Sequence, residues 1–270
     1  MKRLIFLGTG SAMVTHCYNT CFLLETAAGD YFLTDAGGGN GILRQLEAAG
    51  LDWARLHNMF VTHAHTDHIL GVVWLMRKIA TLIEKGKYEG NFTIYCHDVV
   101  AAFLHFTAKA LLKKKDYEKI NTRIIIREVT DGETVALPGL ELTAFDILST
   151  KAKQYGYRLQ NREGFTLTCL GDEPYNEHDR EYAAGADWLL SEAFCRYSDR
   201  EHFKPYEKKH STVKEAAELA TLLGAKNLVL YHTEEETLSV RKATYTAEAR
   251  QYYAGNVFVP EDLEVIALQE

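Results

Sequence analysis

The segment Thr62-His63-Ala64-His65-Thr66-Asp67-His68 places four residues of metal-ligand type, three histidines and one aspartate, within six positions. The apolar run at 57–62 predicts a short β-strand, so the cluster follows the strand's C-terminal end. His63 and His65 are two residues apart, and in an extended segment both side chains project to one face. Zinc sites need imidazoles and carboxylates that converge at about 2.0–2.2 Å. The segment therefore predicts a metal centre, with a histidine-rich polar loop as the alternative.

Three further parts of the chain extend this predicted centre. Asp67 and His68 are expected to continue the same loop before a helix at 69–85, and they offer ligands for a second ion. Leu170-Gly171-Asp172 is an apolar strand that runs into an aspartate, and the alternative is a turn aspartate that caps the strand. Val229-Leu230-Tyr231-His232 ends in a histidine, and the alternative is a structural histidine.

The composition is that of an ordinary globular protein, with 270 residues, 47% hydrophobic and 25% charged. The 37 acidic and 30 basic residues give a net charge of −7, which argues against broad nucleic-acid binding. A small anionic substrate remains compatible, because a bound metal outweighs the global charge locally. No run of ~20 apolar residues predicts a membrane span, and the N-terminal run is too short for a signal peptide. Five scattered cysteines indicate reduced thiols and a cytoplasmic location.

Strands and helices are expected in both halves of the chain, without a linker between them. We therefore expect one domain over residues 1–270, with two β-rich halves packed sheet on sheet and helices outside. Strands are expected at 2–7, 20–26, 31–35, 57–62, 92–96, 124–129, 134–137, 140–148, 155–160, 165–170, 187–192, 227–231 and 264–268. Helices are expected at 42–49, 69–85, 99–113, 212–222 and 245–253.

The central segment resembles the His-x-His-x-Asp-His motif of the metallo-β-lactamase superfamily. Three other segments resemble the ribonuclease Z branch of that superfamily: Phe6-Leu7-Gly8-Thr9-Gly10-Ser11, Tyr155-Gly156-Tyr157-Arg158 and Lys209-His210-Ser211-Thr212. The resemblance covers nearly the whole chain. It implies an α/β fold, the four-layer αββα sandwich of the superfamily, with a dinuclear metal site.

The resemblance also implies a ligand set. His63 and His65 would hold the first ion, Asp67 and His68 the second; Asp172 would bridge the two ions and His232 would complete the second. The expected cofactor is Zn²⁺, as one or two ions, with Mn²⁺ or Fe²⁺ as alternatives.

The catalytic roles implied by the resemblance fall on three residues. A metal-bound hydroxide would attack the substrate, because a bound ion lowers the pKa of water toward ~7. Asp67 would orient or deprotonate that water, and His210 would assist departure of the leaving oxygen. Glu192 would support His210, with an exposed strand-end carboxylate as the alternative for Glu192.

One family ligand is missing from the sequence. The family has a third histidine six residues before the glycine of its Gly-Tyr pair, and Thr150 stands there instead. No histidine occurs between His105 and His178. Because metal affinity depends on ligand count, we expect fewer than two tightly held metals per chain.

Two neighbouring residues offer alternatives to the missing histidine. Lys151 would place an ammonium group where the first ion sits, or is a solvated surface lysine. His16 would replace the ligand or contact the substrate, or is an ordinary loop histidine.

The segment that grips the tRNA body in ribonuclease Z is also missing. Only fourteen residues separate Tyr157 from Asp172, enough for a hairpin. The one dense basic run, Lys113-Lys114-Lys115, is typical of a solvated helix end. A tRNA substrate is therefore not expected.

The sequence thus predicts a metal-dependent hydrolase of a small, anionic molecule, most plausibly by a phosphodiesterase-type reaction. The alternatives are a thioester, lactone or sulfate-ester hydrolase on the same fold, since fold does not fix substrate. The third hypothesis is a non-catalytic metal-binding or sensor protein, because Thr150 replaces one of the family's metal ligands. Many relatives are homodimers, so a homodimer is a further expectation from the resemblance.

Overall fold

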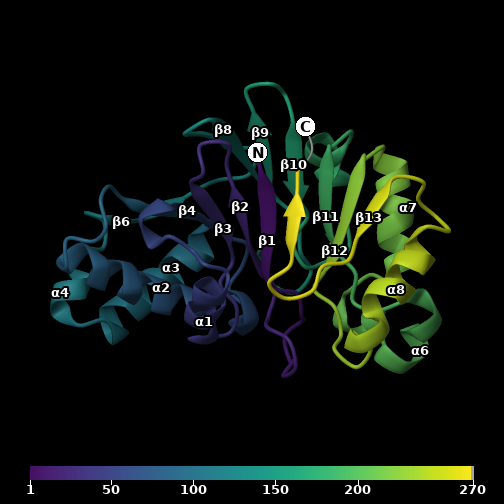
Figure 1. The fold of residues 1–270 in the computed structure, drawn as a ribbon, viewed down its shortest axis with the longest axis horizontal. Coiled ribbons are helices and arrows are strands. Elements are labelled where there is room, and N and C mark those ends of the chain that lie inside the picture. The colour runs from purple at the N-terminus through teal and green to yellow at the C-terminus, as the bar shows by residue number, and fades with distance from the viewer. Residues whose placement is uncertain (269–270) are drawn as a thin grey trace. The chain divides into compact units, whose positions relative to one another are not determined.

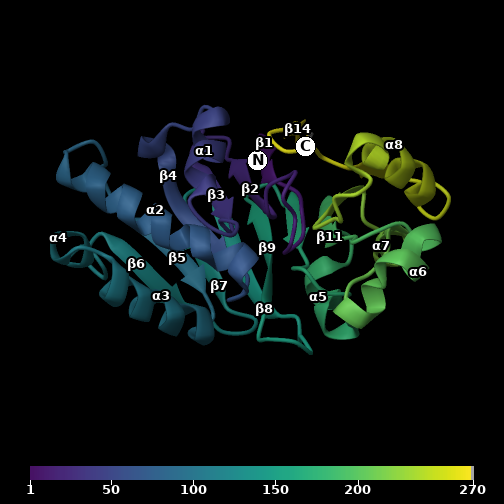
Figure 2. The same ribbon diagram turned by 90° about the horizontal axis from the view of Figure 1, so that it is seen from below.

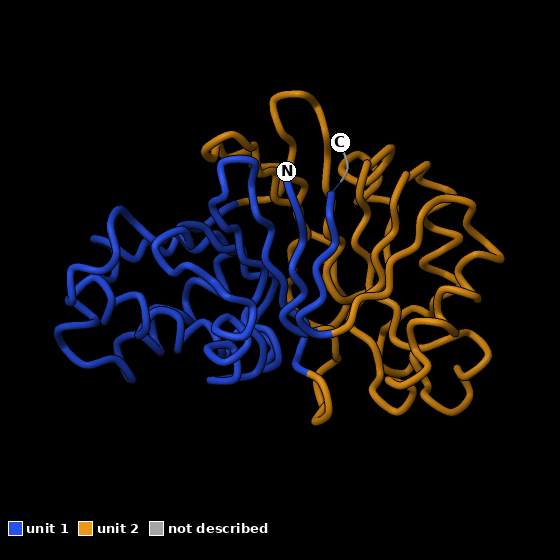
Figure 3. The backbone as a smooth tube through the Cα atoms, viewed as in Figure 1, with its two compact units in different colours: residues 1–8, 18–129, 262–269 blue, residues 9–17, 130–261, 270 orange. Residues whose placement is uncertain are grey.

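The computed structural model describes residues 1–268, which form two compact units (Figure 3). Unit 1 comprises Met1–Gly8, Tyr18–Val129 and the segment from Asp262 onward, and unit 2 comprises Thr9–Cys17 and Thr130–Glu261. Within the described residues, each unit contains one seven-stranded sheet. None of the helices described is long and apolar enough to cross a membrane.

The sheet of unit 1 has the strand order β14-β1-β2-β3-β4-β5-β6 (Figure 1). The pairs β3–β4, β4–β5 and β5–β6 are parallel, whereas the pairs β14–β1, β1–β2 and β2–β3 are antiparallel. The strands are β1 (Arg3–Gly8), β2 (Cys21–Glu25), β3 (Tyr31–Thr34), β4 (Leu56–Val61), β5 (Phe92–Cys96), β6 (Ile124–Glu128) and β14 (Val265–Ala267). The helices are α1 (Gly41–Ala48), α2 (Thr66–Glu84), α3 (Asp98–Leu111) and α4 (Lys114–Tyr117).

Helix α2 packs in the core of unit 1 next to α3 (Figure 2). Val72, Leu75, Met76 and Ile79 recur at helical spacing and are fully buried, which gives the helix its apolar face. Gly71 lets the helix approach the chain after β3, because a Cβ at this position would lie 1.9 Å from the Ala36 carbonyl oxygen. This close approach holds the start of α2 beside the end of β3.

The sheet of unit 2 has the strand order β13-β12-β11-β10-β9-β8-β7. Strands β10 to β13 are parallel, and β7 to β10 form an antiparallel series. The strands are β7 (Thr134–Leu137), β8 (Leu140–Asp146), β9 (Tyr155–Asn161), β10 (Thr166–Cys169), β11 (Trp188–Glu192), β12 (Asn227–Tyr231) and β13 (Asn256–Phe258). The helices are α5 (Arg180–Ala183), α6 (Arg200–Phe203), α7 (Val213–Leu223) and α8 (Leu238–Ala249).

The predicted α/β class, with two sheets and helices, is confirmed. The hairpin expected between residues 155 and 170 is also present, because β9 and β10 pair antiparallel across residues 162–165. The connection between Tyr157 and Asp172 therefore holds no long arm. The expectation of one domain stays a prediction.

Strand β13 and the short helices α4, α5 and α6 were not expected from the sequence, and two helices begin earlier than expected. Helix α8 begins at Leu238 and not at 245. The prediction missed its first turns because their buried face carries the charged residue Arg241. Arg241 is 2% exposed, and its guanidinium donates to Thr233, Thr9 and Pro260. Helix α2 begins at Thr66, so the next two residues lie in its first turn and not in a loop.

Candidate metal centre

Two parallel strands bring the candidate ligands of unit 1 together. β3 and β4 are parallel neighbours, so their carboxyl ends meet at one edge of the sheet. Asp35 follows β3, and Thr62 and His63 follow β4. All three are buried.

Asp35 is the hub of this cluster, and the sequence-based prediction missed it. One carboxylate oxygen, Oδ1, accepts from the Thr62 backbone N–H at 2.8 Å. The other, Oδ2, accepts from the Thr62 hydroxyl at 2.8 Å and from His68 Nδ1 at 2.7 Å. An acidic residue between a strand end and the run Gly37-Gly38-Gly39 was the available signal.

These hydrogen bonds fix the tautomers of two histidines. The single proton of the Thr62 hydroxyl goes to Asp35, so His63 Nδ1, 2.9 Å from that hydroxyl, must donate to it. His68 Nδ1 likewise donates to Asp35. Both rings therefore keep the lone pair on Nε2. Metal-binding histidines are typically oriented by donating one ring N–H to a carboxylate. His68 does so directly, and His63 does so through the Thr62 hydroxyl.

The remaining nitrogen and oxygen atoms of unit 1 face one another. His63 Nε2 lies 2.8 Å from His65 Nδ1, and His68 Nε2 lies 3.2 Å from Asp67 Oδ2. Three imidazoles and one carboxylate thus place atoms of ligand type in two close pairs. Such a donor set fits a divalent ion with nitrogen and oxygen ligands, zinc above all.

Three parallel strands place the candidate residues of unit 2. β10, β11 and β12 are consecutive in the sheet, and their carboxyl ends lead to Asp172, Glu192 and His232. His232 Nε2 lies 3.5 Å from Asp172 Oδ2. The strand-end histidine and aspartate expected from the sequence therefore do lie together.

Gln154 holds Asp172 in place, and the sequence-based prediction missed it too. Its side-chain Nε2 donates to Asp172 Oδ1 at 2.5 Å, and its Oε1 accepts from the Asp172 backbone N–H at 2.7 Å. Gln154 is 0% exposed. No local sequence pattern distinguishes this glutamine from a surface one.

The backbone before Asp172 is constrained as well. Gly171 has φ +82°, and a Cβ there would lie 2.3 Å from the Gln154 amide oxygen. The Tyr231 hydroxyl donates to the Gly171 carbonyl oxygen. Burial raises the pKa of Tyr231 well above its usual value, so the hydroxyl remains a donor. Asp172 is thus fixed from both its side chain and its preceding peptide.

His210 and Glu192 form the second constellation of unit 2. Glu192 Oε2 lies 3.5 Å from His210 Nδ1, and Glu192 Oε1 accepts from the Ser211 backbone N–H. Glu192 is 1% exposed, so the alternative of an exposed carboxylate is wrong. The His210 ring stacks on Phe194 at 5.2 Å and lies 5.0 Å from the His232 ring, between centroids.

The residues around the missing histidine have partners of their own. Thr150 is exposed, and its backbone N–H donates to Glu173 Oε2 at 3.2 Å. The Lys151 ammonium lies 3.8 Å from Glu173 and donates to the Lys208 carbonyl oxygen at 3.2 Å. The loop that carries Thr150 is therefore anchored by a buried carboxylate.

His16 lies in an exposed loop of unit 2. Its backbone N–H donates to Glu235 Oε2, and its ring Nδ1 lies 3.3 Å from the same oxygen. The side chain is 78% exposed. These contacts pair His16 with Glu235.

The chain is similar to known proteins over its whole length. A family model described as "Beta-lactamase superfamily domain" matches residues 30–233. Ribonuclease Z of Thermococcus onnurineus (strain NA1) is 26% identical, with all of this chain and 96% of the relative covered. Ribonuclease Z of Bradyrhizobium sp. (strain ORS 278) is 27% identical, with 92% of this chain and 96% of the relative covered. The first alignment spans 307 positions against 270 residues here, so part of that relative has no counterpart.

Three solved structures share the fold. The metallo-beta-lactamase fold protein YhfI from Bacillus subtilis has a TM-score of 0.79 at 18% identity, over 99% of both chains. Human short-form tRNase Z has a TM-score of 0.74 at 22% identity, over 99% of this chain and 100% of that one. A diphosphatase from the PhnP family has a TM-score of 0.73 at 18% identity, over 100% and 98%. These similarities confirm the predicted fold class.

Proposed function

The chain belongs to the beta-lactamase superfamily and has ribonuclease Z among its relatives, and on that premise we propose that it hydrolyses a small anionic ester, a phosphodiester, with a divalent metal. The observation that carries the proposal is the Asp35 hub, which leaves Nε2 of both His63 and His68 as a lone-pair donor. Metal-binding histidines typically have this arrangement, in which one ring nitrogen donates to an oriented partner and the other binds the ion.

The proposed ligands are taken from the family motif and not from the placement of the units. They are His63, His65, Asp67, His68, Asp172 and His232, as the family motif implies. The nitrogen-rich donor set supports Zn²⁺ as the ion, with Mn²⁺ and Fe²⁺ as alternatives. The bound ion would supply Lewis acidity and an acidified water, whose pKa falls toward ~7.

The chain's own side chains supply the proton transfers. Asp67 accepts a proton from the attacking water. His210 donates a proton to the leaving oxygen; its ring lies 5.0 Å from the ring of His232, between centroids. Glu192 is a positioning residue, since its carboxylate orients His210 and the Ser211 backbone together.

A small substrate is favoured over tRNA by two features of the chain. The β9–β10 hairpin has no arm that could grip an RNA body, and the net charge of −7 opposes binding of a large polyanion. The PhnP-family diphosphatase shows that the same fold accommodates a phosphate-containing substrate.

The proposal is tested by assaying bis(4-nitrophenyl) phosphate with added Zn²⁺ or Mn²⁺, with a pre-tRNA and a thioester as comparison substrates. Metal-dependent turnover of the diester, lost in Asp67→Asn, supports the proposal. Faster turnover of the thioester would favour the alternative of a thioester, lactone or sulfate-ester hydrolase. A folded protein that binds metal but hydrolyses none of these substrates would favour the alternative of a non-catalytic metal-binding or sensor protein.

A further inference from the structure

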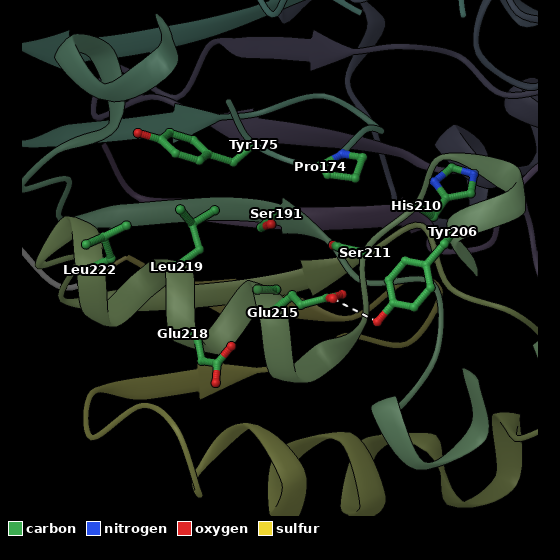
Figure 4. A pocket seen from close by; sticks show the side chains of 11 residues that line it. Pro174, Tyr175, Ser191, Tyr206, His210, Ser211, Glu215, Glu218, Leu219 and Leu222 are labelled. Carbon is green, nitrogen blue, oxygen red and sulfur yellow. Dashed lines mark hydrogen bonds between the residues drawn. The ribbon is translucent and has the colours of Figure 1, made fainter. Parts of the chain in front are cut away.

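A cavity of about 540 Å³ opens beside His210 within unit 2 (Figure 4). One wall is Pro174 and Tyr175, which follow Asp172 in the chain after one intervening residue. The opposite wall is helix α7 together with Tyr206. The cavity therefore adjoins the segment that follows Asp172 and the segment that carries His210, and the proposed function gives both residues a role in the reaction.

The side chains that line the cavity are mostly apolar. Tyr175, Leu219 and Leu222 lie at one end, and Tyr206 lies at the other end near His210 (Figure 4). Leu222 is 59% exposed and Tyr206 is 49% exposed, although both are large hydrophobic side chains. Exposed apolar groups that line a concave surface beside a reactive histidine mark a ligand pocket.

The carboxylates in the cavity disfavour an anion. Glu215 and Glu218 line it, and no lysine or arginine does so among the described residues, although Glu218 Oε1 lies 3.8 Å from the Lys214 ammonium. Glu215 is held by the Tyr206 hydroxyl at 2.8 Å and by the Thr212 cap, so it presents a fixed negative charge. An anionic group placed here would be repelled, and a neutral apolar one would not.

The structure assigns this cavity to a neutral aromatic group of the substrate, carried by the alcohol that leaves. This inference rests on the proposed function, in which His210 protonates the leaving oxygen. His210 lines the cavity, so a group bonded to that oxygen extends into it. The substrate class is then an anionic ester, one of whose alcohols bears an uncharged aromatic ring. Two tyrosine rings and two leucines suit such a ring by area and by ring–ring contact.

Two exposed leucines provide a matched pair of variants. Leu222, 59% exposed, is the penultimate residue of α7 in the cavity, and Leu111, 64% exposed, is the last residue of α3 in unit 1. Leu222→Asp and Leu111→Asp introduce the same charge near a helix C-terminus, so any cost to helix stability is similar. Only the first change adds a charge to the cavity.

Ligand binding is measured first, on the metal-free protein, by ¹⁹F NMR with 4-fluorobenzyl alcohol and 4-fluorobenzoate as probes. We expect the neutral alcohol to bind and the anion to bind far less. Leu222→Asp should weaken binding of the alcohol by about tenfold, because the apolar contact area is lost, and Leu111→Asp should leave it unchanged. Equal binding in the two variants, or preference for the benzoate, would overturn the inference.

Hydrolysis is measured second, on the metal-loaded enzyme, with the benzyl and ethyl esters of methyl phosphate. We expect the benzyl ester to have a KM lower by about tenfold, and Leu222→Asp to remove most of this difference. Turnover of both esters with no such preference would overturn the assignment of the ring to the leaving alcohol. Probe binding without turnover of any ester would instead refute the proposed function and leave the aromatic pocket standing.

Discussion

Gln154 and Asp172 are joined by two hydrogen bonds, one from the glutamine amide to the carboxylate and one from the aspartate backbone N–H to the glutamine oxygen. The pairing occupies Asp172 Oδ1 and leaves Oδ2 facing His232. Gln154 lies four residues after Thr150, in the loop where the family carries its third histidine. The loop that lacks the family's third histidine therefore supplies Gln154, which positions Asp172, the proposed bridging ligand.

We expect Gln154→Ala to weaken binding of Zn²⁺ by about 10- to 100-fold, because partners that orient a ligand contribute this much to metal affinity. Affinity is measured by competition with a chromophoric chelator. Gln160→Ala, in the neighbouring strand β9, is the matched control and should bind metal as the wild type does. Equal affinity in both variants would show that the pairing does not serve metal binding.

The wild-type chain should retain fewer than two metal ions after extensive dialysis, because Thr150 replaces one ligand of the first ion. Mass spectrometry of the metal content gives the stoichiometry. Thr150→His should raise the retained metal toward two ions, whereas Lys151→His, one position away, should not. Two firmly held zinc ions in the wild type would contradict this prediction.

Asp35→Asn should destabilise the metal-free protein by about 1–3 kcal/mol, because the new amide N–H would face donors that now bond a carboxylate. It should also weaken metal binding, since the tautomers of His63 and His68 are no longer fixed. Urea unfolding and chelator competition measure the two effects. Asp30→Asn, at a carboxylate that is 41% exposed, is the control and should change neither.

His210→Ala should slow hydrolysis of esters with poor leaving groups by roughly 100- to 10,000-fold and barely affect esters with good ones, because only the former need general acid assistance. Asp67→Ala should abolish turnover of both kinds. Rates with alkyl and 4-nitrophenyl leaving groups measure the contrast. An equal loss for both leaving groups in His210→Ala would refute the role as a proton donor.

Local pattern was enough to predict most of the strands and the long helices. It missed strand β13 and the short helices α4, α5 and α6. The segment from His63 to His68 contains four candidate ligands within six positions, which made it recognisable from the sequence. Asp172 and His232 were found because each follows an apolar strand. The hairpin before Asp172 was predicted from two strand-like runs on either side of a turn, and the fourteen residues between Tyr157 and Asp172 left no room for a long arm. The start of α8 was missed because the polar Arg241 is buried through hydrogen bonds, which hydrophobic periodicity cannot register.

The sequence by itself determined that this chain carries a metal-binding motif of the beta-lactamase superfamily, lacks one of its histidines and lacks an RNA-binding arm. Only the tertiary structure decided which residues orient those ligands. Asp35 reaches Thr62 across 27 positions, and Gln154 reaches Asp172 across 18. Such pairs form because the pairing of strands within each sheet, set by burial of whole faces, brings distant strand ends and loops together. Spacing along the chain does not encode that pairing.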